Sequence, residues 1–211
     1  MTALMHRKQA FITIVLAASL TLSACSQKTP GDATPMPSPP ATSGNQQPPS
    51  TSGGNSSAKA PNVSKPLDAS KFVADPCLSL TATQLSSFNS TATGKRNDGV
   101  GVACDWNLGS DRSVTAEVAY NAALTAGLSH IYAQNAANFF SDGYFKPTEI
   151  SGYPAAFNNQ IEDRPAGHCS ISVGVTDQLF FTISISGRTG TDGCKASENV
   201  AKAVVQTIQG G

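Results

Sequence analysis

The chain has 211 residues, with 14 basic side chains, 14 acidic side chains and five cysteines. This length predicts one domain, or one domain with appendages. Arg7 and Lys8 are the only charged residues before residue 25, so the rest of the chain holds 12 basic and 14 acidic side chains. A weakly acidic surface lacks the basic stripe that nucleic-acid binding requires, so no nucleic-acid partner is expected.

The N-terminus has the pattern of a bacterial export signal. Arg7 and Lys8 precede an apolar run over residues 10–22, which is shorter than the ~20 residues of a membrane-spanning helix. The run ends in Leu22-Ser23-Ala24-Cys25, which resembles the lipobox of bacterial lipoproteins. We therefore predict a signal peptide over residues 1–24, cleavage between Ala24 and Cys25, and acyl chains on Cys25. A secretory signal cleaved elsewhere, or a buried helix, is the alternative.

Acylation would set the location of the protein. Each buried CH₂ contributes ~0.8 kcal/mol, so two or three chains on Cys25 hold firmly where one does not. The expected location is the outer, extracytoplasmic face of the cell membrane, with the acyl chains as the contact to the bilayer.

Residues 25–70 have the composition of a tether. Nine of the 13 prolines fall here, among Ser, Thr, Gly, Asn and Gln, and large apolar residues are almost absent. Such a composition cannot offset the entropy of ordering the backbone, so it predicts a disordered Pro/Ser/Thr/Gly-rich linker after the lipidated cysteine.

Residues 71–211 carry the patterns of a folded domain. Thr81 and Gln84 form a capping-box signature that opens a short helix. Alternation predicts strands over 100–107 and 113–120, and helical spacing predicts a helix over 123–140. That helix has a stripe of Leu124, Leu128, Ile131, Asn135 and Phe139. A strand with a turn at Gly152 is expected over 148–156, and an amphipathic helix over 195–208.

The clearest local prediction is a hairpin over residues 169–185. A three-residue loop at 176–178 would pair Val175 with Leu179 and Val173 with Phe181. This register places both apolar sets on the same face, whereas a two-residue turn at Asp177-Gln178 would pair Val175 with Phe180 and place them on opposite faces. The combined pattern predicts an α+β domain with an antiparallel sheet and helices packed on one face; a closed β-sandwich is the alternative.

Four cysteines remain besides Cys25, and an even number in an exported domain indicates disulfides. Three connectivities are possible. We favour Cys77–Cys104 and Cys169–Cys194, because each joins neighbouring elements. A zinc site is the rival interpretation, but the chain has no Cys-x-x-Cys pair, so no metal or other cofactor is expected.

Several of these motifs occur together in a known family. Asp75-Pro76-Cys77, Cys104-Asp105-Trp106 and Gly152-Tyr153-Pro154-Ala155, followed by Cys169 and Cys194, resemble a family of actinobacterial lipoproteins classed as a domain of unknown function. The resemblance covers residue 72 to the C-terminus. It implies an exported, membrane-anchored α+β domain with paired cysteines, and it implies no activity.

Candidate functional residues are few. Trp106 should share a strand face with Cys104, either packed on a disulfide or facing a ligand. His130 is expected at the surface of its helix and His168 away from the core. His168 with Glu162 or Asp163 would suggest a hydrolase, but no Gly-x-Ser-x-Gly elbow is present, so we predict no catalytic residues.

The sequence therefore predicts a non-enzymatic, membrane-anchored binding or accessory module. Its partner would be a small apolar ligand, a wall glycan or a membrane protein. A sensor or interaction domain that modulates a membrane partner is the alternative, and a hydrolase is a third.

Overall fold

The computed structural model describes residues 58–91, 93–98 and 101–210. The predicted signal peptide, its cleavage site, Cys25 and the first part of the predicted linker lie outside these residues. What the sequence predicts for these segments therefore stays a prediction.

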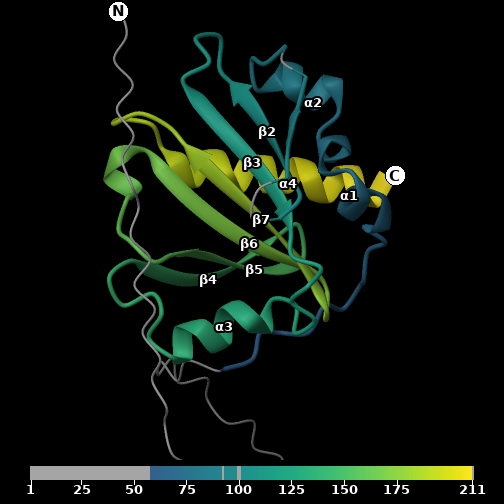
Figure 1. Ribbon diagram of the computed structural model, residues 1–211, viewed down its shortest axis with the longest axis vertical. Helices are drawn as coiled ribbons and strands as arrows, with labels where there is room; N and C mark the ends of the chain where they lie inside the picture. The colour runs from purple at the N-terminus through teal and green to yellow at the C-terminus, as the bar shows by residue number, and fades with distance from the viewer. Residues whose placement is uncertain (1–57, 92, 99–100, 211) are drawn as a thin grey trace, which may run out of the picture. The chain divides into compact units, whose positions relative to one another are not determined.

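The described residues form a seven-stranded antiparallel sheet in the order β1-β2-β3-β7-β6-β5-β4 (Figure 1). The strands are β1 (Lys95–Asn97), β2 (Ala103–Leu108), β3 (Val114–Tyr120), β4 (Tyr144–Ile150), β5 (Tyr153–Asn159), β6 (His168–Thr176) and β7 (Leu179–Ser186). All neighbouring strands are antiparallel, which confirms the predicted α+β class with an antiparallel sheet.

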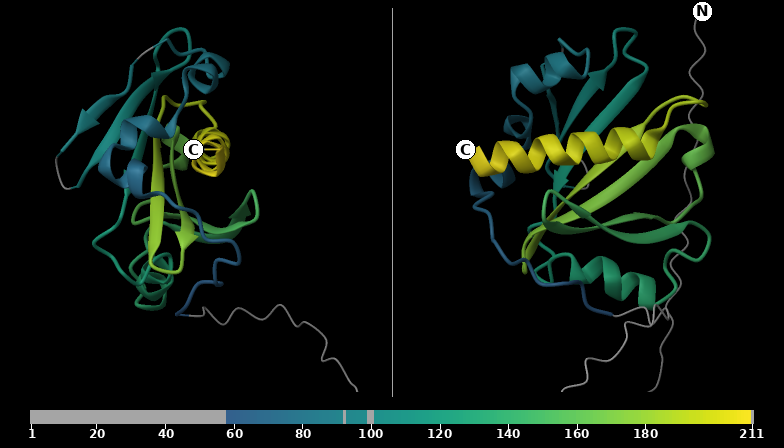
Figure 2. Two further views of the ribbon diagram at one scale, coloured as in Figure 1. Left: turned by 90° about the vertical axis from the view of Figure 1, so that its right-hand side faces the viewer. Right: turned by 180° about the vertical axis from the view of Figure 1, so that it is seen from behind.

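A long C-terminal helix covers one face of the sheet (Figure 2, right). The helices are α1 (Ser70–Ala74), α2 (Ala82–Ser87), α3 (Ser129–Ala136) and α4 (Gly193–Gly210), with 3₁₀ turns η1 (Pro76–Ser79) and η2 (Arg164–Ala166). Side chains of α1, η1 and α2 join those of α4 in one core cluster, so these elements share the α4 face of the sheet.

The strands alternate between the two faces as the sequence pattern predicts. Val118, Ile171 and Ile183 are fully buried and pack in the same cluster as Val200 and Val204 of α4. Phe180, one residue before the α4-facing Phe181, belongs instead to a second cluster with Ile131 and Tyr132 of α3. Because adjacent residues on a strand point to opposite faces, α3 covers the second face at one end of the sheet.

The β6–β7 hairpin keeps the predicted register over most of its length. Val173 lies opposite Phe181, Ile171 opposite Ile183 and Cys169 opposite Ile185. The turn differs: Thr176 pairs with Leu179, and an irregularity between Gly174 and Thr176 takes up the extra residue. A bulge with a two-residue turn therefore replaces the predicted three-residue loop.

The helix predicted over 123–140 was too long. The observed α3 has eight residues, and Phe139, a member of the predicted stripe, is 44% exposed. Gly127 and Asn138 have positive φ angles of 55° and 61°, which interrupt helical geometry on either side of α3. Apolar spacing continued past both residues, so the pattern alone overestimated the helix.

The strand predicted over 148–156 is two strands, β4 and β5. Ser151 and Gly152 both have positive φ, as a two-residue hairpin turn requires, so the turn expected at Gly152 is confirmed. β4 was mostly missed because it is an edge strand: only Tyr144 and Ile150 at its ends are buried, and Pro147 interrupts it.

Residues 58–69, which the sequence places in the linker, pack against the domain as an extended segment that we call the strap. Ala60, Val63 and Ala69 are buried. The backbone amide of Leu67 donates to the Val175 carbonyl at 2.9 Å. The packed chain thus begins before Lys71, because three isolated small apolar side chains suffice to anchor a segment whose composition is otherwise that of a linker.

Both predicted disulfides are present. Cys77–Cys104 joins η1 to β2, and Cys169–Cys194 joins β6 to α4. Each bridge therefore ties the helical layer to the sheet, across sequence separations of 27 and 25 residues.

We expect the double variant Cys169→Ala/Cys194→Ala to lose about 2–5 kcal/mol of unfolding free energy, because the unfolded chain regains the entropy of an open loop. Urea denaturation of the oxidised proteins measures this loss, with the exposed Ser186→Ala as control. Stability equal to that of the control would contradict the bracing role of this bridge.

Candidate functional site

The only tryptophan of the chain lies beside a disulfide. Trp106 is 1% exposed and Cys104, two residues earlier on the same face of β2, is fully buried. A Cβ built on Gly94 would lie 2.5 Å from Cys104 Sγ and 2.7 Å from Trp106 Nε1. The Gly94 backbone therefore rests on both groups, and the sequence prediction that the indole and the bridge lie together is correct.

A hollow of about 420 Å³ opens over this pair. Its floor is apolar and consists of Trp106, Cys77, Leu80 and Leu85, which come from β2, η1 and α2. Its rim is polar and carries hydroxyl groups. The rim residues are Ser86, Thr91 and Thr93, together with Ala82 and Gly94, and the lining also includes the buried Ser90. We call this the Trp106 hollow; an apolar floor with a few polar rim groups is the usual composition of a small-molecule site.

The first turn of α2 is held firmly at the edge of this hollow. Thr81 Oγ1 accepts from the Gln84 amide while Gln84 Oε1 accepts from the Thr81 amide, which confirms the predicted capping box. Gln84 Nε2 also donates to the Ala203 carbonyl of α4 at 2.8 Å. The α2 wall is thereby fixed to the long helix as well as to its own N-cap.

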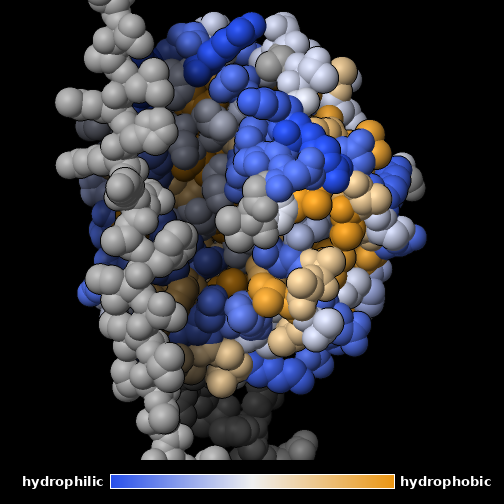
Figure 3. All heavy atoms as spheres, in the orientation of Figure 1, coloured by the Kyte–Doolittle hydropathy of each residue, from blue (hydrophilic) through white to orange (hydrophobic). Residues whose placement is uncertain are grey.

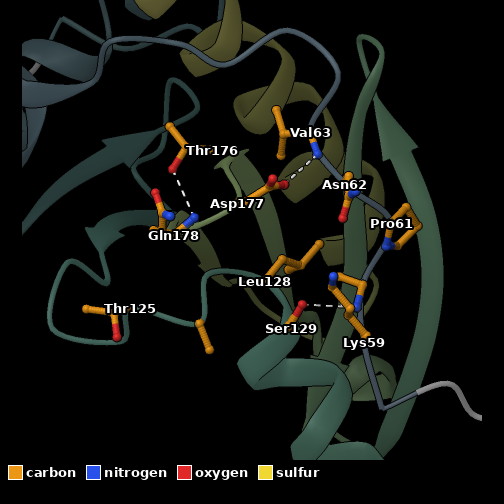
Figure 4. Close-up of a pocket in the computed structure, with 12 residues that line it drawn as sticks. Lys59, Pro61, Asn62, Val63, Thr125, Leu128, Ser129, Thr176, Asp177 and Gln178 are labelled. Carbon is orange, nitrogen blue, oxygen red and sulfur yellow. Dashed lines mark hydrogen bonds between the residues drawn. The ribbon is translucent and has the colours of Figure 1, made fainter.

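A second hollow, of about 350 Å³, lies between the strap, the turn before α3 and the β6–β7 turn (Figure 4). Asp177 Oδ1 accepts from the Val63 amide at 2.9 Å, and Ser129 Oγ accepts from the Ala60 amide at 3.2 Å. Gly127 also approaches the Asp177 carbonyl so closely that a Cβ would lie 2.4 Å from its oxygen. These polar groups hold the strap, so this hollow is a structural junction.

The face of the sheet opposite α4 is polar over β2, β3, β7 and β6. Ser172 Oγ and Thr182 Oγ1 are 3.2 Å apart, and Ser170 Oγ donates to Ser184 Oγ at 3.4 Å. Figure 3 shows hydrophilic side chains over much of this side of the molecule, especially in the upper part of the view. The same face carries Phe180, which packs in the α3 cluster at one end of the sheet. The part of this face that carries the hydroxyl groups therefore offers hydrogen bonds to a partner.

Two carboxyl groups face each other on that polar surface. Asp105 of β2 and Glu117 of β3 are direct cross-strand partners, and Lys95 of β1 lies on the other side of Asp105. Burial and then the neighbouring charge of Asp105 raise the pKa of Glu117. When both carboxyl groups are ionised, the repulsion between them destabilises the folded state.

The residues considered for catalysis do not form a hydrogen-bonded set. Glu162 pairs with Arg164, and Asp163 Oδ2 accepts from Asn159 Nδ2 at 2.8 Å. Among the described residues, no hydrogen bond joins the His168 side chain to either carboxylate. His130, expected at the surface, is half-buried at the second position of α3.

Metal-binding clusters and membrane-spanning helices are both absent from the described residues. No group of three or more His, Cys, Asp or Glu side chains within them is arranged to hold a metal ion. In the same part of the chain, no helix combines the length and apolarity needed to cross a bilayer.

The sheet, the two bridges and the Trp106 hollow define a disulfide-bonded α+β domain with a small concave site. A family model described as "Protein of unknown function (DUF3558)" matches residues 20–207, and the chain belongs to this family. No curated protein and no solved structure gives a significant match.

The sequence pointed to only part of the Trp106 hollow. Trp106 was singled out by its spacing from Cys104, but Ser90, Thr91, Thr93 and Gly94 carried no signal. Their positions depend on contacts between residues that are distant in the chain, such as the 2.6 Å hydrogen bond from Ser90 Oγ to the Asn107 carbonyl.

We expect Glu117→Gln to stabilise the protein at pH 7 by about 0.2–1 kcal/mol, the range of cross-strand pair energies. A raised pKa means that the folded state binds the proton more tightly than the unfolded state, so ionisation costs stability as pH rises through the folded pKa. The gain should therefore shrink near pH 4.

Urea denaturation at both pH values measures this effect. Glu149→Gln, an exposed glutamate on the edge strand β4, controls for the change in net charge. Destabilisation by Glu117→Gln at pH 7 would show that the carboxylate is stabilised rather than strained by its neighbours.

Proposed function

We propose that this protein is a lipid-anchored lipoprotein of the bacterial cell envelope that binds a ligand without catalysis. Acyl chains on Cys25 would hold it on the extracytoplasmic face of the cell membrane, as in the actinobacterial lipoproteins that its motifs resemble. Two observations support this address. Structural disulfides are typical of oxidising, exported compartments. The family match also begins at residue 20 and thus includes Leu22–Cys25.

The Trp106 hollow is the observation that carries the binding role. Its floor joins an indole, a disulfide and two leucine side chains, which favour an apolar group. Its volume of about 420 Å³ is within the range of small-molecule sites and near the lower end. The rim hydroxyls of Thr91 and Thr93 supply hydrogen bonds for one polar end. An amphipathic small molecule with a ring or short alkyl portion agrees best with this arrangement.

The polar face supports a second candidate role. The hydroxyl ladder of β6 and β7, together with Asp105 and Glu117, offers donors and acceptors for a wall glycan or a partner protein. An interaction module that modulates a membrane partner would use this face instead of the Trp106 hollow. Perturbation of residues on β3 and β7, and not of Trp106, would then mark binding.

The anchoring proposal predicts the N-terminus of the mature protein. Purified from membranes, the chain should begin at Cys25 and carry the mass of a diacylglycerol group there. The variant Cys25→Ser should be unacylated and no longer fractionate with membranes. Intact-mass and N-terminal peptide analysis test this, and a mature chain that begins at another residue would contradict it.

The binding proposal predicts that an apolar dye with one polar group enters the Trp106 hollow. Because Trp106 is the only tryptophan, energy transfer from it to bound anilinonaphthalene sulfonate reports binding of the dye to the domain, and a pair of variants then assigns the dye to this hollow. Ala82→Phe at the rim should weaken binding of the dye about tenfold, which corresponds to ~1.4 kcal/mol. Thr83→Phe, exposed on the same helix but outside the hollow, is the matched control.

Two results would contradict a site in this hollow. One is dye binding without energy transfer from Trp106, and the other is equal affinity of both variants. If the dye does bind in the hollow, its displacement by lipid or by glycan fractions of the envelope would assign the class of the natural ligand.

A further inference from the structure

Three large apolar side chains are well exposed among the described residues, and two of them lie on neighbouring loops. Phe139 is 44% exposed and Ile161 is 60% exposed. The backbone amide of Glu162 donates to the Asp142 carbonyl at 3.1 Å, which joins the loop after α3 to the loop after β5. We call the surface formed by Phe139 and Ile161 the α3-end face. The third side chain, Leu78, is 50% exposed in η1.

An aromatic cluster supports the α3-end face from below. The Phe139 ring meets the Phe140 ring edge-on at 5.3 Å, and Phe140 stacks on Phe145 at 6.0 Å. Tyr132 of α3 in turn meets Phe145 at 5.0 Å. Phe140 and Tyr132 are buried, so the exposed Phe139 extends from a rigid base and is not a loose side chain.

The strap begins on the same side of the molecule. Ala60 belongs to the buried cluster that contains Phe140 and Tyr132, and its amide bonds to Ser129 at the start of α3. Figures 1 and 2 show the first described residues beside α3, from where the strap runs past the β6–β7 turn towards α1. The preceding chain therefore joins the domain beside α3, the helix that precedes the loop with Phe139.

We propose that the α3-end face rests on the surface of the bilayer to which Cys25 is anchored. This inference depends on the anchoring proposed above. Only the 32 residues 26–57 separate Cys25 from the strap, and such a segment reaches roughly 110 Å at most. The anchor thus limits the distance between the domain and the bilayer to roughly 110 Å, and the connection enters the domain beside α3.

The charges around this face indicate an apolar contact. Asp142 and Glu162 flank Phe139 and Ile161, and Glu162 is already paired with Arg164. In the two described loops, acidic residues outnumber basic ones around these side chains, so attraction to anionic lipids is not expected to contribute. The contact should form on zwitterionic bilayers and should not weaken as the salt concentration rises.

Two partly exposed side chains bind a bilayer only weakly by themselves. The anchor strengthens this binding, because in the anchored protein the contact between the α3-end face and the bilayer becomes intramolecular. The effective concentration of the bilayer at this face is thereby raised. The face is therefore expected to dock in the anchored protein and to remain in solution in the variant without acyl chains.

Depth-dependent quenching tests the proposal on the full acylated protein. Phe139→Trp, Ile161→Trp and Leu78→Trp are each reconstituted in phosphatidylcholine vesicles that contain brominated lipid. Leu78 is the matched control, because it is similarly exposed but lies beside Phe72 and the C-terminal end of α4. The native Trp106 is buried in all three proteins.

We expect brominated lipid to quench the indole introduced by Phe139→Trp or by Ile161→Trp. The indole introduced by Leu78→Trp should be quenched several-fold less. Equal quenching in all three variants, or none, would overturn docking through this face. Absent quenching together with cross-linked dimers would assign the face to a second copy and equally overturn the proposal.

Flotation of the vesicles separates this inference from the anchoring on which it depends. A protein that does not float with the vesicles would refute the proposed anchor itself. A protein that floats but shows no selective quenching would refute only the docking of the α3-end face.

Discussion

The bridge between Cys77 and Cys104 is the contact on which the helical layer and its hollow depend. Helices α1 and α2 have five and six residues, too short to be stable without tertiary contacts. The bridge fixes η1, which lies between them, to β2 in the sheet. The buried hydrogen bond between Ser79 and Tyr120, 2.9 Å long, and the Gln84 contact with α4 complete the attachment. Without this layer, Trp106 would lose the walls that surround it.

The second bridge has the same role at the other end of the helical layer. Cys169 of β6 holds Cys194 in the first turn of α4, and this helix then crosses β6 and β7. Gly193 and Gly167 allow the backbones to approach closely there, since a Cβ on Gly193 would lie 2.6 Å from the Gly167 carbonyl oxygen. The two bridges thus attach the same layer at two separate positions, so the Trp106 hollow is formed between covalently linked parts. The proposed binding of a ligand would therefore need little reorganisation.

Local signals predicted the elements that local interactions determine. The Thr81–Gln84 capping box, the register of Ile171 with Ile183 and the pairing of the cysteines were all confirmed, because each depends on spacing that the chain itself displays. The strap was missed because Ala60 and Val63 gain their burial from α3 and the β6–β7 turn, which are distant in sequence. The same holds for the hollow: Trp106 was recognised by its spacing from Cys104, but its rim comes from segments that only the fold brings together.

The proposed function, a ligand-binding domain held near a bilayer by acyl chains, would account for these features. Its central claim is that binding occurs at the Trp106 hollow. The most direct measurement is a ¹⁵N-resolved NMR titration of the protein with envelope lipid and glycan extracts, which reports on the single indole N–H and on the backbone amides together. The account predicts that the Trp106 indole signal and the amides of Leu85 and Gly94 shift with one saturating curve. Shifts confined to the polar face of β3 and β7, or no shifts with either extract, would contradict it.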